Sequence, residues 1–218
     1  MKRNTALLLV LCLLLTIPFT ACSASPESLE QDAKGDIQMG VWSEDNTVFV
    51  NKWSGIKFAL PDNWRALTAE EMSATIGAGE EMLINDGRTT RKNLDMSKTQ
   101  TVFDFSIMSA HGLPNVAASY VNLALTSDME FMDEKGYYDV IKRNLLSLSS
   151  VDFAEIGTTS KTVASEVYLI GAFSANQGTS FQDYYLRKTD NVMITFVVTY
   201  TDETKAEADA FIASIEKA

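Results

Sequence analysis

The side chains best suited to chemistry are scarce in this chain, which has one histidine, His111, and two cysteines, Cys12 and Cys22. A Ser-His-acid site or a histidine-based metal site would need His111. The sequence contains no Gly-x-Ser-x-Gly elbow and no His-Glu-x-x-His motif to support such a site. We therefore expect His111 to be a loop residue, and we expect the protein not to be an enzyme.

Carboxylates are abundant, but their spacing does not favour catalysis or metal binding. Two adjacent pairs and one run stand out: Glu70 with Glu71, Glu80 with Glu81, and Asp128, Glu130, Asp133 and Glu134. Adjacent side chains on a helix point apart, so capping and solvation explain the pairs better than acid-base catalysis. The run lacks the alternating ligands and the glycine of an EF-hand loop, which favours a charged helix start. We expect no metal and no cofactor.

The N-terminus has the features of an export signal. Lys2 and Arg3 give it a positive start, and residues 7–17 form a short, leucine-rich apolar core. This core is shorter than the roughly 20 apolar residues that a transmembrane helix needs. The chain therefore begins with an export signal peptide, and the run Phe19-Thr20-Ala21-Cys22 follows its apolar core.

That run resembles the lipobox of bacterial lipoproteins, although Phe19 stands where leucine is usual. The resemblance implies that a signal peptide at residues 1–21 ends with Ala21 and that Cys22 receives a diacylglyceryl group. Two lipid chains hold a protein at a membrane durably. We expect an anchor on the extracytoplasmic face of the cell membrane; the alternative is a plain secretory peptide cut nearby, for example after Ala24.

Loss of Cys12 and acylation of Cys22 would leave no thiol for a disulfide or for catalysis, so stability must come from an ordinary core. Residues 22–40 hold few large apolar residues and are predicted to form a flexible tether. Residues 41–218 are enough for a single domain with a substantial core.

The chain is acidic, with a formal net charge of −11 that becomes −13 when Lys2 and Arg3 leave with the signal. Such a surface repels nucleic acid and anionic lipid headgroups, so we expect neither as a partner of the domain surface. We attribute the charge to solubility outside the cell rather than to a specific cationic ligand.

A β-hairpin is expected at the start of the domain. Residues 47–53 and 56–60 are β-prone runs on either side of Gly55. Pro61 cannot donate to a β-ladder and turns the chain out of the sheet. Trp64 is the expected anchor that packs this turn onto the body.

A helix follows the turn. Thr68 and Glu71 match a capping box, and Met72 and Ile76 can face inward before Gly77 ends the helix. The next clear feature is a polar stretch at residues 86–98.

Three cations stand out in that stretch: Arg88, Arg91 and Lys92. Loops on rigid scaffolds often carry binding residues, so these three form a candidate binding loop. The alternative is a solvated excursion without a function.

Residues 102–110 alternate in hydrophobicity, which predicts a strand with Phe103, Phe105 and Ile107 on one apolar face. Residues 116–125 also favour a strand. Two tyrosine pairs follow later in the chain, and each is expected to place one ring inward and one outward: Tyr137 with Tyr138, and Tyr184 with Tyr185.

The rest of the chain predicts a helix, four strands and a last helix. Ser127 or Asp133 can cap a helix to about Leu148, and Thr201 or Asp202 opens the last one. The strand candidates are residues 151–156, 162–175, 181–188 and 192–200. Hairpin-linked strands with helices around them indicate an α+β fold, an antiparallel sheet covered by helices.

Together these features resemble the Mog/PsbP-like superfamily. The resemblance rests on the Pro-x-x-Trp corner at residues 61–64, the capped helix after it, and the closing strands and helix. It covers roughly residues 46–218 and implies an antiparallel sheet sandwiched by helices. Members mostly act as binding or accessory proteins, and none of their known metal or partner residues can be placed here.

Three functions of different class follow. We prefer a non-enzymatic protein-binding or assembly module with an unknown protein partner, which predicts an exposed apolar patch. The alternative is a small-molecule carrier or sensor with a cavity between sheet and helix, which the methionines suit. The third is a hydrolase that uses His111.

Overall fold

The structure is a computed structural model that describes residues 37–87, 89–91, 100–125 and 129–218. It has the expected α+β class. The larger sheet has seven strands in the order β4-β5-β6-β10-β9-β8-β7, and every neighbouring pair is antiparallel. Its strands are β4 (Trp64–Ala66), β5 (Thr101–Ser109), β6 (Asn115–Asn122), β7 (Phe153–Val163), β8 (Glu166–Ala175), β9 (Ser180–Thr189) and β10 (Val192–Tyr200).

A smaller sheet has the order β1-β2-β3-β11, with β1 (Val41–Trp42), β2 (Val48–Asn51), β3 (Ile56–Ala59) and β11 (Glu216–Lys217). The expected hairpin is confirmed, because Val48 pairs with Ala59 and Asn51 with Ile56. Its turn contains Gly55 at φ 75°, a left-handed conformation that glycine adopts without a steric penalty. The short strand β11 was not expected.

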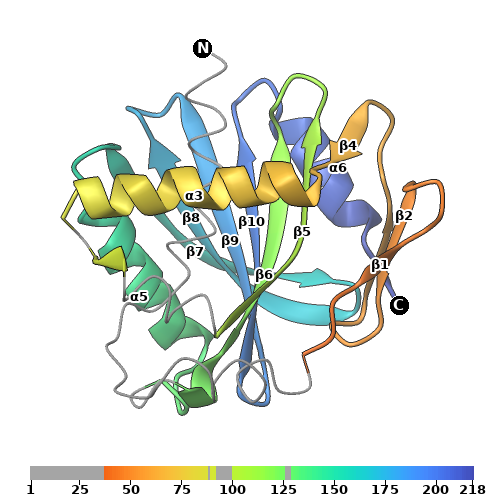
Figure 1. The fold of residues 1–218 in the computed structure, drawn as a ribbon, viewed down its shortest axis with the longest axis horizontal. Coiled ribbons are helices and arrows are strands. Elements are labelled where there is room, and N and C mark those ends of the chain that lie inside the picture. The colour runs from red at the N-terminus through yellow and green to blue at the C-terminus, as the bar shows by residue number, and fades with distance from the viewer. Residues whose placement is uncertain (1–36, 88, 92–99, 126–128) are drawn as a thin grey trace.

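Helices and the smaller sheet cover both faces of the larger sheet. The helices are α3 (Ala69–Asn85), α5 (Glu134–Leu146) and α6 (Lys205–Ser214), with a short 3-10 turn η1 (Leu123–Leu125). In Figure 1, α3 crosses the strands on the near face, α5 lies beside it, and α6 lies behind the sheet. The predicted sandwich of a sheet between helices is therefore present.

Two clusters of buried side chains correspond to these two faces. The first joins Leu83 of α3 and Ile141 of α5 to the sheet. The second joins Phe58 of the smaller sheet and Phe211 of α6 to the opposite face. Burial on both faces explains why the central strands are apolar on both sides.

Trp64 anchors its turn as predicted. Only 6% of its surface is exposed, and its ring stacks on Phe211 with centroids 5.2 Å apart. Its indole N–H also donates to the carboxylate of Glu207. The corner is thereby fixed to α6.

The expected end of the first helix at Gly77 is wrong, because α3 continues to Asn85 with its C-cap at Asp86. Glycine costs about 1 kcal/mol inside a helix, and burial of Leu83 one turn and a half later outweighs this. The glycine at the true end is Gly87, with φ 70°.

The expected apolar face of β5 is also wrong. Its pairing with β6 shifts between Phe103 and Phe105, which marks a β-bulge. Phe103 therefore packs against the first cluster, whereas Phe105 and Ile107 belong to the second. The extra residue at the bulge, Asp104, is buried.

The four C-terminal strands are confirmed, but the boundary between the first two lies later in the chain than expected. β7 extends to Val163, and the turn to β8 is formed by Ala164 and Ser165, both at positive φ. This two-residue turn has no glycine or asparagine to signal it.

Of the two caps expected for α5, the structure has Asp133, whose side chain accepts from the Gly136 amide at 2.8 Å. The last helix begins later than expected. Its N-cap is Thr204 rather than Thr201 or Asp202, because the Thr204 hydroxyl accepts from the Thr201 amide and closes a turn first.

Candidate binding groove between a helix and the sheet edge

A groove of about 630 Å³ lies between α3 and the start of β5. Its walls come from the segment before β1, the inward side of α3, and the first residues of β5. The lining residues are Ile37, Met39, Ala69, Met72, Ser73, Ile76, Gly77, Glu80, Thr101, Val102 and Phe103. We call this feature the α3–β5 groove.

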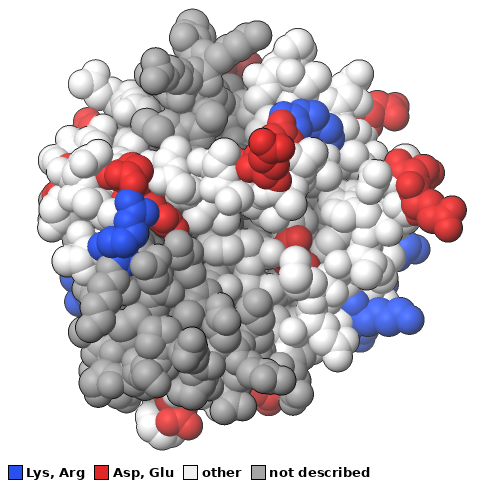
Figure 2. All heavy atoms as spheres, in the orientation of Figure 1, with Lys and Arg blue, Asp and Glu red and all other residues white. Residues whose placement is uncertain are grey.

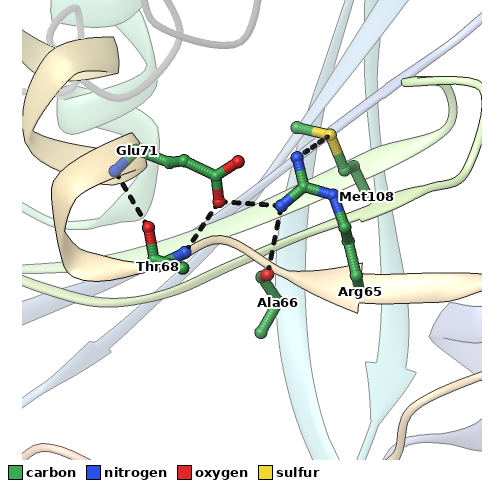
Figure 3. Close-up of polar contacts among 5 residues, drawn as sticks. All are labelled: Arg65, Ala66, Thr68, Glu71 and Met108. Atoms are coloured by element: carbon green, nitrogen blue, oxygen red, sulfur yellow. Dashed lines mark hydrogen bonds and ion pairs between the residues drawn. The ribbon is translucent and has the colours of Figure 1, made fainter.

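A capping box fixes the first turn of α3, as predicted. The Glu71 amide donates to Thr68 Oγ1 at 3.2 Å, and the Thr68 amide donates to Glu71 Oε2 at 2.9 Å (Figure 3). Arg65 Nη1 reaches the same Glu71 oxygen at 2.7 Å, and these bonds lower the pKa of that carboxyl. The helix wall is therefore tied to β4, the strand that carries Arg65.

The far end of α3 is fixed as well. Its C-cap residue Asp86 accepts from the Ser149 amide at 2.9 Å, and the Ser149 hydroxyl donates to the same carboxylate. Because both ends of α3 are held, the spacing between the helix and β5 is set by the fold.

The groove exists because the edge of the sheet is incomplete here. β4 pairs with β5 only from Ala66 opposite Ile107 to Trp64 opposite Ser109. No other described strand lies on this side of β5. Residues 37–40 and α3 therefore flank the first half of β5 in place of a strand.

Asp104 holds residues 37–40 in this position. Its Oδ1 accepts from the Gly40 amide at 2.7 Å, and its Oδ2 accepts from Asn51 Nδ2 at 2.8 Å and from the Tyr120 hydroxyl at 2.5 Å. Asn51 also donates to the Gln38 carbonyl at 3.0 Å. The bulge thus provides the residue that fixes one wall of the groove.

We call Asp104 and its hydrogen-bond donors Gly40, Asn51 and Tyr120 the Asp104 clamp. Burial is the main influence on the pKa values of its ionisable groups. It raises the pKa of the Asp104 carboxyl, against the hydrogen bonds from Tyr120 and Asn51, which lower it. Burial likewise raises the pKa of the Tyr120 hydroxyl, and the neighbouring Asp104 charge adds to that shift. The pair therefore keeps its hydrogen bond with the tyrosine protonated.

One charged side chain lines the groove. Glu80 has a side chain that is only 5% exposed, and Arg91 Nη1 lies 3.2 Å from its Oε2. The same guanidinium binds the exposed carboxylate of Glu81. The structure therefore brings one predicted loop residue, Arg91, to the carboxylate that lines the groove.

Figure 2 shows the face that α3 covers. Charged side chains gather near the two ends of α3, where Arg65 pairs with Glu71 and Arg91 with Glu80 and Glu81. Most of the described surface between these ends is uncharged, apart from one small acidic patch near the middle of the view. A largely uncharged surface beside an apolar groove suits a ligand that is itself largely apolar.

The lining also limits the chemistry of the groove. Ser73 and Thr101 offer hydroxyls, and Glu80 offers a carboxylate that is paired with Arg91. The described lining contains no histidine and no lysine, the bases that most often activate a hydroxyl nucleophile.

The other residues singled out in the sequence lie elsewhere. Ala21, Cys22, Arg88, Lys92 and Asp128 fall outside the described residues. His111 lies exposed in the turn between β5 and β6.

Two acids of the run before α5 have structural roles. Asp133 caps that helix, and Glu134 Oε1 accepts from the Lys188 amide at 2.8 Å. In the part of the chain that the structure describes, no group of three or more His, Cys, Asp or Glu is placed to hold a metal ion. No helix among the described residues is long and apolar enough to cross a bilayer.

The prediction for the tyrosine pairs is wrong, because all four rings are buried: Tyr137, Tyr138, Tyr184 and Tyr185. Tyr184 and Tyr185 point to opposite faces of β9, and each face is covered. On α5, Tyr138 fits over the bare backbone of Gly171, which makes room for a second ring. None of the four presents an exposed ring.

The groove residues were missed in the sequence because their elements were misplaced. The sequence predicts that Met72 and Ile76 face inward on a helix that ends at Gly77, whereas the helix continues to Asn85. The helical spacing of Met72, Ile76 and Glu80 across Gly77 was the available signal. Ile37 and Met39 fell in the expected tether, where no role was assigned.

Neither a protein-family model nor a curated protein matches this sequence. The chain is similar in structure to cyanobacterial PsbP (CyanoP) from Synechocystis sp. PCC 6803, with a TM-score of 0.48 and 11% identity over 78% of this chain and 91% of that one. It is also similar to LpqN, involved in cell envelope biogenesis of Mycobacterium tuberculosis, with a TM-score of 0.39 and 13% identity over 74% of this chain and 82% of that one.

A third similar structure is a protein from Bacteroides thetaiotaomicron VPI-5482, with a TM-score of 0.38 and 11% identity over 79% of this chain and 48% of that one.

Proposed function

We propose that this protein is a non-enzymatic, lipid-anchored binding protein of the extracytoplasmic membrane face, and that the α3–β5 groove holds a small, largely apolar molecule. The observation that carries the proposal is the groove itself: about 630 Å³ between a helix and the sheet edge, with a mostly apolar lining. Small-molecule sites commonly occupy roughly 300–1,000 Å³ and combine apolar walls with a few polar groups. We therefore prefer the hypothesis of a small-molecule carrier or sensor to that of a protein-binding module.

The position of the groove supports this role. Ile37 and Met39 line it, so it lies where the predicted tether joins the domain. A lipid on Cys22 would keep this end of the domain close to the membrane, where apolar molecules concentrate. The methionines Met39 and Met72 supply flexible, polarisable surface that adapts to ligands of different shape.

A protein partner is the second candidate, and one observation favours it. Met39, which lines the groove, and Val41, two residues further along the chain, are 56% and 67% exposed. Exposed apolar residues beside a groove are suited to receive a partner side chain. A stable interface buries about 800 Å² on each partner, which is more than these two residues supply.

The first experiment measures binding of 1-aminoanthracene, a neutral fluorescent probe, to the chain from residue 22 with Cys22→Ser. Gly77→Leu is the blocking variant, because a Cβ at Gly77 meets nothing within 4 Å and the added side chain fills the groove. Ala74→Leu is the matched control, since it makes the same residue at an exposed position of α3 outside the lining.

We expect saturable binding that weakens at least tenfold in Gly77→Leu and is unchanged in Ala74→Leu. Equal binding to both variants would show that the probe does not use the groove. To test the protein partner, a photo-crosslinking amino acid replaces Met39 in the anchored protein in its host, with Val167 as the exposed apolar control. A single protein captured from position 39 alone would favour the second candidate.

A further inference from the structure

A second cavity, of about 410 Å³, lies on the opposite face of the larger sheet, between α6 and strands β7 to β10. We call it the α6 pocket. Its lining shares no residue with the α3–β5 groove.

Aromatic rings form much of its wall. Phe181 and Tyr200 stack with centroids 5.6 Å apart, and Tyr185 lies beside them on β9 and is 3% exposed. Ile156, Ile170 and Ala172 complete the apolar part of the lining. Such a wall binds an apolar body, and the ring faces also attract cations.

A carboxylate lies among these rings. The Tyr200 hydroxyl is 3.2 Å from both oxygens of Asp183, which is longer than the usual 2.5–3.0 Å of an O–H···O hydrogen bond. Burial raises the pKa of the Asp183 carboxyl, while Tyr200, Lys205 and Lys161 oppose that shift. The negative charge of Asp183 is therefore poorly compensated by the hydroxyl that it contacts.

A cation of the protein already uses this surface. Lys205 Nζ lies 5.5 Å from the centroid of the Tyr200 ring and 2.6 Å from Asp209 Oδ2. The other charged groups in the lining are Lys161 and Asp202, so the pocket holds three carboxylates and two ammonium groups. The local charge is negative, and the geometry for a cation on the ring is present.

We propose that the α6 pocket binds a small organic cation, of the quaternary ammonium or alkylammonium class, between the Asp183 carboxylate and the Tyr200 ring. The cation would neutralise the half-buried carboxylate, and its alkyl groups would contact Phe181 and Ile170. Lys205 occupies the rim and competes with this ligand for the ring. This site is independent of the groove proposed above.

The test uses choline and its neutral carbon isostere, 3,3-dimethyl-1-butanol, titrated into the chain from residue 22 with Cys22→Ser. Binding is followed by isothermal titration calorimetry and by NMR shifts of the ring protons. We expect choline to bind at least tenfold more tightly than the isostere, because only choline gains from the carboxylate and the ring face. Equal affinities, or no binding of choline at 100 mM, would overturn the proposal.

Two substitutions with opposite expected effects separate binding from folding. Asp183→Asn keeps the shape and removes the charge, so choline should bind at least fivefold more weakly while the isostere is unaffected. Lys205→Ala removes the competing cation from an exposed site, so choline should bind at least threefold more tightly. Asp152→Asn, at an exposed position outside the pocket, is the control and should change nothing. Weaker binding of choline to Lys205→Ala would contradict the competition.

Discussion

The amide of Gly40 donates a 2.7 Å hydrogen bond to Asp104 Oδ1, across 64 positions of the sequence. This bond joins the start of the domain to the bulge in β5 and fixes the wall of the α3–β5 groove that Ile37 and Met39 form. The Gly40 position also has no room for a side chain, because a Cβ there would lie 2.1 Å from Cζ of Phe49. The joint therefore depends on one carboxylate and one glycine.

Replacing Asp104 with Ala should destabilise the domain by about 1–3 kcal/mol, because its three hydrogen-bond donors lose their acceptor in a buried site. Urea denaturation measures this change, with Asp152→Ala as the exposed control. Limited proteolysis should also cut earlier near residues 38–41. Unchanged stability together with unchanged proteolysis would mean that the clamp does not hold this segment.

Two glycine substitutions should act in opposite directions. A Cβ on Gly171 would lie 2.2 Å from Cε2 of Tyr138, so Gly171→Ala should lower the free energy of unfolding by about 1–3 kcal/mol through overpacking. Gly77 lies inside α3 with open space around it, so Gly77→Ala should raise that energy by about 0.5–1 kcal/mol. Thermal unfolding of the two variants beside the parent protein tests both signs.

Stability should fall as the pH rises from about 4 to 7. Burial raises the pKa of Asp104 and of Asp183 above 3.8, so the folded protein binds these protons more tightly than the unfolded chain does. Each group contributes stability that is full below 3.8 and is lost as the pH passes its folded pKa.

The exposed acids with lowered pKa, such as Glu71, act in the opposite sense and at lower pH, because their contribution is lost as the pH falls. We therefore measure the free energy of unfolding by urea denaturation at several pH values between 4 and 7. This free energy should fall less steeply with rising pH in Asp183→Asn than in the parent protein. An identical dependence on pH in the two proteins would show that the pKa of Asp183 is the same in the folded and unfolded states.

We propose that the anchor is a lipid on Cys22; Cys22→Ser should then abolish incorporation of labelled fatty acid and release the protein from the membrane fraction. Chains from which the leader has been removed should then be recovered in soluble form. Ser23→Ala is the neighbouring control and should stay anchored. Membrane retention of unlabelled Cys22→Ser would point to an anchor other than the lipid.

Local signals in the sequence predicted much of the fold. The capping box of Thr68 and Glu71, the Pro-x-x-Trp corner and the paired strands at the C-terminus all depend on neighbours within a few residues, and each is confirmed. For the same reason, the sequence limits the N-cap of α5 to two candidates, Ser127 and Asp133, and the structure has Asp133.

The groove was not predictable in this way. It depends on α3 continuing through Gly77, on the bulge that buries Asp104, and on β4 being too short to cover β5. These are tertiary outcomes, decided by packing between segments distant in the sequence. The α6 pocket could not be predicted from the sequence for the same reason. Asp183 and Lys205 come together only when β9, β10 and α6 are assembled.

The order of strands in the larger sheet has a consequence for how the chain is made. β10 is inserted between β6 and β9, so the two halves of the larger sheet meet only through the strand of that sheet that is made last. A ribosome releases the N-terminal half first, and the edge of β6 that faces away from β5 has no partner in this sheet until Val192–Tyr200 emerges. The open edge of β6 is a site for mispairing with other chains during that interval. Shortening the C-terminus would therefore cause aggregation rather than merely lower stability.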